Sequence, residues 1–373
     1  MLQILMKPEL HKFKTCKEFA QAFNLCNQDL VLTNQYIYEP YFGPLGLDVK
    51  TIYQERYGSG EPTDVMAEQI FAAAARQGDY RRIIAIGGGT IIDIAKAMSV
   101  CTGSKKMDDL YAAMPVLKKN CELILIPTTC GTGSEMTNVA VFNRTQMGTK
   151  MGLVSEAMYA DQAILIPELM RSLPFGVFAS SSIDALVHAV ESCLSPKATP
   201  YTRIFGYKAI EMILSGYQKI VAHGTECLEA LLEDFLIAAN FAGISFGTAG
   251  CAAVHAMAYP LGGTYHVSHG ESNYAMFTGV LRKYMELKCD GEIAVLNRYL
   301  SQLLSCKPDS VYDQLETLLN QILPKRSLRE YGATEEDLVQ FSRSVVDTQQ
   351  RLMANNFVPL DFEQVLEIYQ ELY

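Results

Sequence analysis

The sequence contains little charge and few histidines, and we expect no targeting or membrane-anchoring segment in it. Only 19% of its 373 residues are charged, the net charge is −10, and no cluster of lysines or arginines occurs. A nucleic-acid partner is therefore excluded, because neutralising phosphates needs a basic face. No apolar run reaches the roughly 18–20 residues of a membrane span, so a membrane partner is not expected. The first residues lack a charged leader followed by an apolar core, so no export signal is expected either.

The ten cysteines form no recognisable disulfide or metal-binding pattern. They are scattered from Cys16 to Cys306 without close pairing and without a Cys-x-x-Cys motif. In a chain without an export signal, this distribution predicts reduced thiols and a cytoplasmic location. The length of the chain and its apolar content of 49% predict two globular domains with sizeable cores.

Short apolar runs in the first half of the chain predict buried parallel strands. Such continuous runs are typical of strands that are covered on both faces. They occupy residues 29–33, 82–86 and 123–127, and a helical stretch lies around Met66–Gln77. This alternation of strands and helices predicts an α/β domain with a doubly wound, mostly parallel sheet.

From about residue 180 the apolar spacing becomes helical, and no clear strands are visible. The helical segments are 182–192, 204–217, 227–246, 311–322 and 361–372. We place the domain boundary near Pro174–Ser180. The expected organisation is an α/β domain over residues 1–178 and an all-helical domain over residues 179–373.

A glycine triplet follows the second predicted strand directly and opens a helix over residues 92–99. It reads Gly87-Gly88-Gly89-Thr90-Ile91-Ile92-Asp93. Glycines at a strand-to-helix turn let the backbone approach a pyrophosphate, whose charge is favoured at a helix N-terminus. The spacing of Thr90 and Asp93 also fits a capping box, which would serve only to start the helix.

A second glycine-rich stretch follows the third predicted strand. It contains two glycines and four hydroxyls, those of Thr128, Thr129, Thr132 and Ser134. Hydroxyls and exposed backbone amides can bind phosphate and ribose oxygens, although the same residues can form an ordinary Ser/Thr turn. Two such loops at the ends of neighbouring strands favour a nucleotide crevice.

Three of the six histidines fall in the segment 255–269. Pro260, Gly262 and Gly263 predict a turn inside this segment, which can bring His269 back beside His255. Far upstream, the i, i+4 spacing of Asp184 and His188 puts a carboxylate and an imidazole on one helix face.

One oxygen and three nitrogen ligands would suit a divalent transition metal. The alternative is that scattered histidines merely satisfy hydrogen bonds in the core. Glu191 continues the face of Asp184 and His188, and we interpret it as a partner of the ligands rather than as a ligand.

In combination, these motifs resemble the iron-containing (group III) alcohol dehydrogenase family. The resemblance rests on the glycine triplet ending at Asp93, the stretch 127–137 and the spacing of Asp184, His188, His255 and His269. It covers nearly the whole chain. Within the family the chain is most similar to the 4-hydroxybutyrate dehydrogenases, in the segments 138–141, 259–266, 270–274, 328–332 and 349–356.

The resemblance implies an N-terminal domain that binds NAD(P) and a helical domain that holds the metal through Asp184, His188, His255 and His269. The nucleotide residues that it implies are Gly87, Gly88, Gly89, Thr90, Asp93, Thr128, Thr129, Thr132 and Ser134. Lys150 matches a position in the family's active-site cleft, although it can also be an ordinary surface lysine. The metal is expected to be Fe²⁺ or Zn²⁺, since imidazole and carboxylate accept both. A homodimer or larger homo-oligomer is also implied.

The chain departs from the family pattern at two informative positions. Many relatives carry a histidine for proton relay where this chain has Tyr259, so Tyr259 and His266 become the candidates for catalytic proton transfer. Many relatives also end their second strand with an aspartate that bonds the ribose, and here that position is Asn34. An uncharged residue there weakens the electrostatic case for NAD over NADP.

The implied reaction is hydride transfer between NAD(H) and a primary alcohol or aldehyde, with 4-hydroxybutyrate and succinate semialdehyde as the expected pair. The carboxylate of such a substrate needs a cation, and Arg351 is the candidate; the alternative is a surface arginine. A dehydrogenase for uncharged alcohols such as butanol or 1,3-propanediol is a second possibility. Dehydroquinate-synthase-like enzymes share the architecture, but this site segment is poor in the basic residues that their phosphorylated substrate requires.

Overall fold

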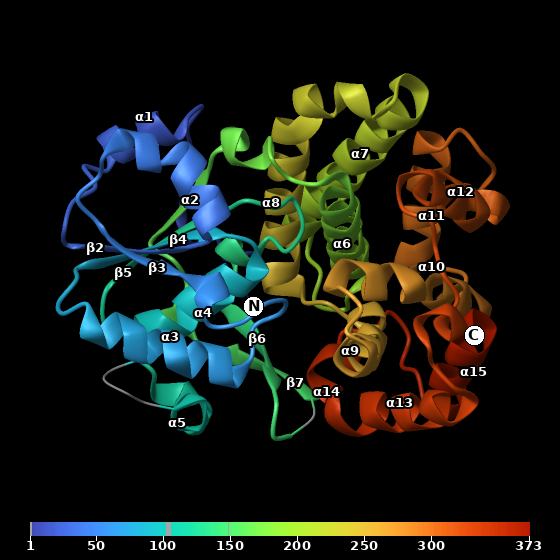
Figure 1. Cartoon of the computed structure of the whole chain (residues 1–373). Coiled ribbons are helices and arrows are strands. Elements are labelled where there is room, and N and C mark those ends of the chain that lie inside the picture. The colour runs from blue at the N-terminus through green and yellow to red at the C-terminus, as the bar shows by residue number, and fades with distance from the viewer. Residues whose placement is uncertain (1, 102–105, 148) are drawn as a thin grey trace. The chain divides into compact units, whose positions relative to one another are not determined.

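The computed structural model of the chain describes residues 2–101, 106–147 and 149–373. Within these residues, six strands form one parallel sheet (Figure 1). The order across the sheet is β1-β8-β5-β4-β2-β3. The strands are β1 (Glu9–Lys12), β2 (Asp29–Thr33), β3 (Lys50–Tyr53), β4 (Arg82–Gly87), β5 (Glu122–Pro127) and β8 (Gln162–Leu165). An antiparallel hairpin, β6 (Val139–Arg144) and β7 (Thr149–Val154), stands apart from this sheet.

Helices cover both faces of the sheet, as predicted for a doubly wound domain. The N-terminal helices are α1 (Cys16–Ala22), α2 (Gln35–Tyr41), α3 (Asp64–Arg76), α4 (Gly89–Val100) and α5 (Met107–Ala112). Alternate residues of β4 point to opposite faces, because side chains alternate along a strand. Ile84 and Ile86 pack in the core shared with α1 and α2, and Ile83 and Ala85 pack with α3, α4 and α5.

The three strands predicted from apolar runs are confirmed as β2, β4 and β5, whereas β1, β3 and β8 were not predicted. The strands β1 and β3 lie at the two edges of the sheet. The sequence of β1, Glu-Leu-His-Lys, is largely exposed. An edge strand has only one neighbour and less burial, so it lacks the continuous apolar run that marks a central strand.

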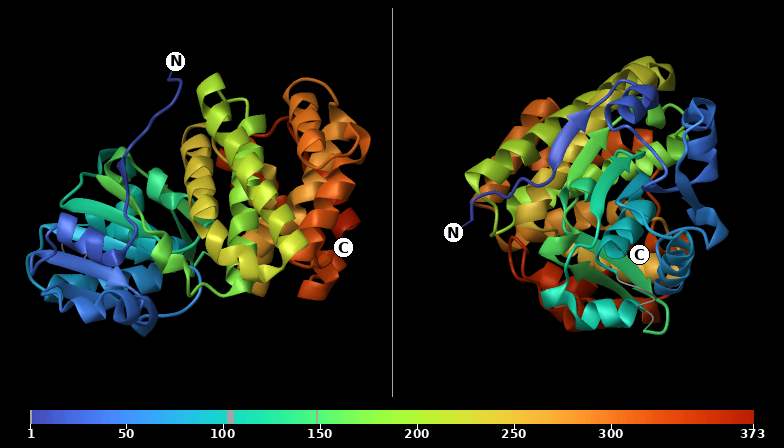
Figure 2. Two further views of the ribbon diagram at one scale, coloured as in Figure 1. Left: turned by 90° about the horizontal axis from the view of Figure 1, so that it is seen from above. Right: turned by 90° about the vertical axis from the view of Figure 1, so that its left-hand side faces the viewer.

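The rest of the chain is helical, as expected, and within the described residues no strand follows β8. Its helices are α6 (Phe175–Leu194), α7 (Pro200–His223), α8 (Leu232–Ala249), α9 (Ala253–Tyr265), α10 (His269–Leu287), α11 (Glu292–Leu303), α12 (Val311–Ile322), α13 (Glu335–Thr348), α14 (Gln350–Met353) and α15 (Phe362–Leu372). The long helices α6, α7 and α8 pack against one another, and Figure 2 shows them side by side in green and yellow.

The chain divides into two compact units, Met6–Leu173 and Pro174–Tyr373, and the first residues up to Leu5 belong to the helical unit. Two hydrogen bonds hold those first residues there. The Thr199 hydroxyl donates to the Gln3 carbonyl at 2.6 Å, and the Leu5 amide donates to the Thr248 hydroxyl at 3.3 Å.

Among the described residues, α6 is long and apolar enough to cross a membrane by length and composition alone. However, 83% of that stretch is buried inside the protein, which is also typical of the core helix of a globular domain. A second candidate exists only if α8, with the 3₁₀ turn before it, and α9 are taken as one span, and those two pieces are bent by 106°.

Candidate metal centre and nucleotide loops

The structure brings Asp184, His188, His255 and His269 together from three helices. Asp184 and His188 lie one turn apart on α6, His255 lies on α9, and His269 is the first residue of α10. One nitrogen or carboxylate oxygen of each residue lies within 4.8 Å of those of the other three.

The Asp184 carboxylate lies near all three imidazoles. Its oxygens are 3.9 Å from Nδ1 of His188, 3.7 Å from Nε2 of His255 and 3.8 Å from Nε2 of His269. These separations are too long for hydrogen bonds. They are close to the roughly 3.4 Å between two ligands of a tetrahedral ion bound at about 2.1 Å.

Two buried nitrogens support a metal at this place. Nδ1 of His188 and Nε2 of His255 are buried and have no hydrogen-bond partner among the described residues. A buried polar atom without a partner costs free energy, and a bound cation would remove that cost for both. Burial by itself would raise the pKa of Asp184, but His188, His269 and His255 outweigh burial and the pKa is lowered. An ionised carboxylate and three imidazoles therefore fit a divalent metal.

Neighbouring residues hold these side chains in place. The Glu191 carboxylate lies 2.6 Å from Nδ1 of His255, and it accepts from the backbone amides of Ala252 at 3.0 Å and Val254 at 2.7 Å. This bond places the proton of His255 on Nδ1 and leaves Nε2 facing Asp184. The Asn273 amide donates to Oδ1 of Asp184 at 2.7 Å. The interpretation of Glu191 as a partner of the ligands agrees with these contacts.

The turn between His255 and His269 lies later than predicted. Helix α9 continues through Pro260 and the two glycines to Tyr265, so the prediction of a break at Pro260–Gly263 was wrong. Proline removes one helical hydrogen bond, but the helix resumes after it. The chain instead turns at His266, whose φ of +54° is left-handed.

Close packing then fixes where α10 begins. A Cβ added to Gly270 would overlap the Ser180 carbonyl oxygen of α6. Only glycine therefore allows this approach, which sets His269 beside Asp184.

The other predicted residues of the helical unit lie in different surroundings. Tyr259 is buried on α9, and its ring centroid is 6.1 Å from that of His269. His266 is exposed at the end of α9. Arg351 is exposed on α14, and Asn355 ties that segment to the turn before α9 by donating to the Cys251 carbonyl at 2.8 Å.

The two glycine-rich loops lie side by side at the carboxyl ends of β4 and β5. Gly87 pairs with Pro127, and the Thr128 amide donates to the Gly87 carbonyl at 3.1 Å. A Cβ on Gly89 would lie 2.9 Å from Cγ2 of Thr132. Because α4 begins at Gly89, the first backbone N–H groups of this helix, which have no partner within it, also lie at these loops.

Within these loops, Asp93 and Ser134 bond to each other. The Ser134 hydroxyl donates to Oδ1 of Asp93 at 2.7 Å, and the Val141 amide donates to Oδ2 at 2.8 Å. The capping-box alternative for Thr90 and Asp93 was wrong, because α4 starts earlier, with Gly88 as its N-cap. The Thr90 hydroxyl instead donates to the Gly60 carbonyl at 3.0 Å.

Lys96 was missed in the sequence and connects both loops. Its buried ammonium donates to the Ser134 hydroxyl at 2.6 Å, the Thr137 hydroxyl at 3.0 Å and the Val139 carbonyl at 2.8 Å. Burial lowers the pKa of Lys96 from 10.5 to about 8, although Asp93 and Glu135 oppose this shift. The available signal was a lysine one turn after Asp93 on an otherwise apolar helix.

Lys150 is buried on β7 and is not the surface lysine that the alternative interpretation assumed. Its ammonium forms an ion pair with the Glu61 carboxylate at 2.5 Å.

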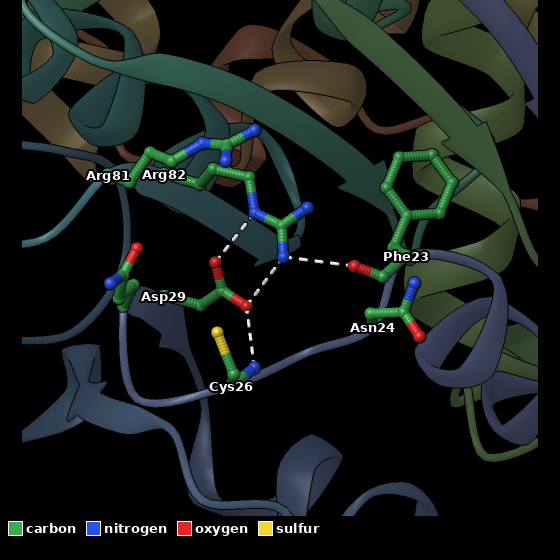
Figure 3. Close-up of a pocket in the computed structure, with 7 residues that line it drawn as sticks. Phe23, Asn24, Cys26, Asp29, Arg81 and Arg82 are labelled. Carbon is green, nitrogen blue, oxygen red and sulfur yellow. Dashed lines mark hydrogen bonds and ion pairs between the residues drawn. The ribbon is translucent and has the colours of Figure 1, made fainter.

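A pocket of about 250 Å³ at the amino ends of β2 and β4 lies away from the glycine loops (Figure 3). Its Arg82 donates to both Asp29 oxygens, at 2.6 and 2.8 Å, so this cation is already neutralised.

Comparison with known proteins agrees with both halves of this arrangement. The model of iron-containing alcohol dehydrogenases matches residues 11–167, and the model of the C-terminal part of Fe-containing alcohol dehydrogenases matches residues 178–373. The chain belongs to the iron-containing alcohol dehydrogenase family. As a member of this family it is an NAD-dependent oxidoreductase.

Individual relatives have different substrates in their names. The chain is 43% identical to 4-hydroxybutyrate dehydrogenase of Clostridium kluyveri over 373 residues, which is 100% of both chains. It is 34% identical to long-chain-alcohol dehydrogenase 1 of Geobacillus thermodenitrificans, over 86% of this chain and 83% of that one. Among solved structures, sulfoacetaldehyde reductase of Bifidobacterium kashiwanohense in complex with NAD⁺ superimposes with a TM-score of 0.83 at 22% identity, covering 100% and 99% of the two chains. That likeness shows the shared fold.

Proposed function

We propose that the protein is a cytoplasmic, metal-dependent dehydrogenase that interconverts 4-hydroxybutyrate and succinate semialdehyde with NAD(H). The observation that carries the proposal is the cluster of Asp184, His188, His255 and His269, of which the first three are buried. Two of its imidazole nitrogens lack a hydrogen-bond partner among the described residues. The choice of substrate is supported by the full-length similarity to the Clostridium kluyveri enzyme. Among the described residues no cysteine forms a disulfide, which is compatible with the proposed reducing compartment.

The four clustered residues would hold a divalent ion, Fe²⁺ or Zn²⁺. Such an ion, when bound, supplies Lewis-acid stabilisation of negative charge on the substrate oxygen while the nicotinamide exchanges a hydride. Asp184 would contribute the charged ligand. Glu191 would hold a proton on Nδ1 of His255, so that Nε2 is the nitrogen that could bind the ion, and Asn273 orients the Asp184 carboxylate.

The nucleotide would lie on the two glycine-rich loops. Gly88, Gly89 and the hydroxyls of Thr129 and Thr132 are the groups proposed to meet its phosphates, because the N-terminus of α4 favours negative charge. We assign Asp93 and Ser134 a positioning role, because their polar atoms already bond to each other and to Lys96 or Val141.

The alcohol proton needs a path to solvent. We propose that the hydroxyl of Tyr259, one turn after His255, takes part in this proton transfer. We propose that the exposed His266 then exchanges the proton with water. Arg351 is proposed to bind the substrate carboxylate. Its helix α14 packs on α9, and its side chain is exposed.

The test compares two aldehydes and two arginine variants. Arg351→Ala should raise the KM for succinate semialdehyde about 10-fold to 150-fold, the equivalent of one charge-assisted hydrogen bond. It should change the KM for butanal less than about twofold. Arg343→Ala removes an exposed arginine from α13 and should leave both constants unchanged. Equal effects of Arg351→Ala on both aldehydes contradict the assigned role of Arg351.

A wild-type enzyme that prefers butanal over succinate semialdehyde would contradict the proposed substrate and favour an uncharged alcohol instead. Removal of metal by a chelator should abolish the reaction, and Fe²⁺ or Zn²⁺ should restore it. Full activity in protein shown by elemental analysis to be metal-free would contradict the metal-dependent mechanism.

A further inference from the structure

The carboxyl end of β2 lies directly beside the first glycine loop. Thr33 pairs with Ile86 of β4, and its hydroxyl donates to the Ile86 carbonyl at 2.8 Å. Asn34 and Gly87 are the next residues on the two strands. A dinucleotide on a glycine loop extends its adenosine ribose to the end of such a neighbouring strand, where an acidic side chain accepts from the ribose hydroxyls. Asn34 cannot supply that charge.

The Asn34 side chain is occupied by its neighbours. Its Nδ2 donates to Oε1 of Gln54 at 3.1 Å and to Oε2 of Glu55 at 3.0 Å. Its Oδ1 accepts from the Tyr36 hydroxyl at 3.2 Å. The amide is therefore oriented with its N–H groups toward Glu55, and Asn34 positions a carboxylate that comes from another strand.

Glu55 reaches the end of β2 because β3 is the next strand of the sheet. Tyr53, the last residue of β3, pairs with Thr33, and the 3₁₀ turn Gln54–Arg56 follows directly. The second carboxylate oxygen of Glu55 accepts from the Gln35 amide at the start of α2 at 2.7 Å. A carboxylate has about four acceptor positions. These two contacts use two of them, and the side chain is exposed.

We infer that Glu55, held by Asn34, is the ribose-binding carboxylate of this enzyme and that it selects NAD over NADP. The inference rests on the proposed function of the glycine loops. Glu55 would accept from the ribose hydroxyls of NAD, whereas a 2′-phosphate of NADP, with a charge near −1.5 to −2, would be repelled by it. The neighbouring cation, Arg56, stacks on the Tyr53 ring, with 4.9 Å between its guanidinium carbon and the ring centroid.

The inference is tested by titrating the full-length, metal-loaded protein with NADH and with NADPH and following the nucleotide fluorescence. The wild type should bind NADH at least tenfold more tightly than NADPH. Glu55→Gln keeps an acceptor for the Gln35 amide but removes the charge, and it should reduce that ratio about 10-fold to 100-fold. Asn34→Ala keeps the charge but frees the carboxylate, so it should weaken NADH binding while NADPH stays disfavoured.

The matched control is Glu122→Gln. It removes one carboxylate from the same sheet, but at the amino end of β5, opposite to the carboxyl ends where Glu55 lies. It should leave the ratio unchanged, and thermal unfolding checks that each variant is folded. If both nucleotides bind and Glu55→Gln leaves the ratio of their affinities unchanged, the inference about Glu55 is overturned and the proposed function is not. A wild type that binds NADPH as tightly as NADH also overturns the inference. Binding of neither nucleotide overturns the proposed function as well.

Discussion

Replacement of Glu191 by glutamine should weaken metal binding without removing a ligand. The Glu191 carboxylate faces three N–H groups, those of Ala252, Val254 and the His255 ring. A glutamine side chain has only one acceptor oxygen, so its amide group must face at least one of these donors. The best orientation of the substituted side chain keeps the contacts that Oε2 makes in the wild type and leaves the Val254 amide unsatisfied.

The magnitudes follow from this geometry. One unsatisfied buried donor costs about 1–3 kcal/mol of folding free energy. Loss of the charge behind His255 lowers metal affinity about 10-fold to 100-fold, as for other partners of ligating histidines. At a fixed excess of metal, the stabilisation of the protein by the metal should then shrink by about 1.4–2.7 kcal/mol.

The assay is competition for Zn²⁺ or Co²⁺ between the protein and a coloured chelator, together with thermal unfolding of the metal-free and metal-loaded forms. Glu316→Gln is the control. Glu316 lies on α12 and accepts from Thr278, Lys325 and Arg282, so its loss should lower stability and leave metal affinity unchanged. If Glu191→Gln bound metal within about threefold of the wild type, the positioning role of Glu191 would be refuted.

Two further predictions concern Lys96 and Gly270. The folded-state pKa of Lys96, about 8, lies below its ordinary value of 10.5, so the unfolded chain binds more protons between these values. The free energy of unfolding of the wild type, minus that of Lys96→Met, should therefore rise by about 2 kcal/mol between pH 7 and pH 9.5, as measured by urea titrations. If this difference did not change with pH, the protein would not contain a charged, buried Lys96. Gly270→Ala forces a Cβ against the Ser180 carbonyl and should cost about 1–3 kcal/mol of stability and weaken Co²⁺ binding, whereas an alanine at the exposed Gly176 should do neither.

Much of the architecture could be predicted from the chain because its signals are local. Continuous apolar runs marked β2, β4 and β5, since central strands are buried on both faces. The edge strands β1 and β3 carried no such run. The i, i+4 spacing of Asp184 and His188 was sufficient to put both on one face of α6, because helical geometry alone decides it.

The position of the turn before His269 was predicted incorrectly because glycine and proline are only statistical signals. Pro260 lies inside α9, and the helix tolerates the loss of one hydrogen bond because its surroundings are buried and helical. The turn depends on the positive φ of His266, and only a few per cent of non-glycine residues adopt such a conformation. Nothing local in the sequence marks that position.

The sequence by itself determined that an α/β domain is followed by a helical one. It also determined the two glycine-rich turns and the identity of the four residues proposed as ligands. Only the tertiary structure showed that Lys96 lies beneath both loops and that Glu55 reaches over the end of β2 to Asn34. The reason is physical: periodicity and turn chemistry act over a few residues, whereas these contacts join segments 20 to 40 residues apart. Such contacts form when strands take their order in the sheet, and that order depends on packing across the whole domain.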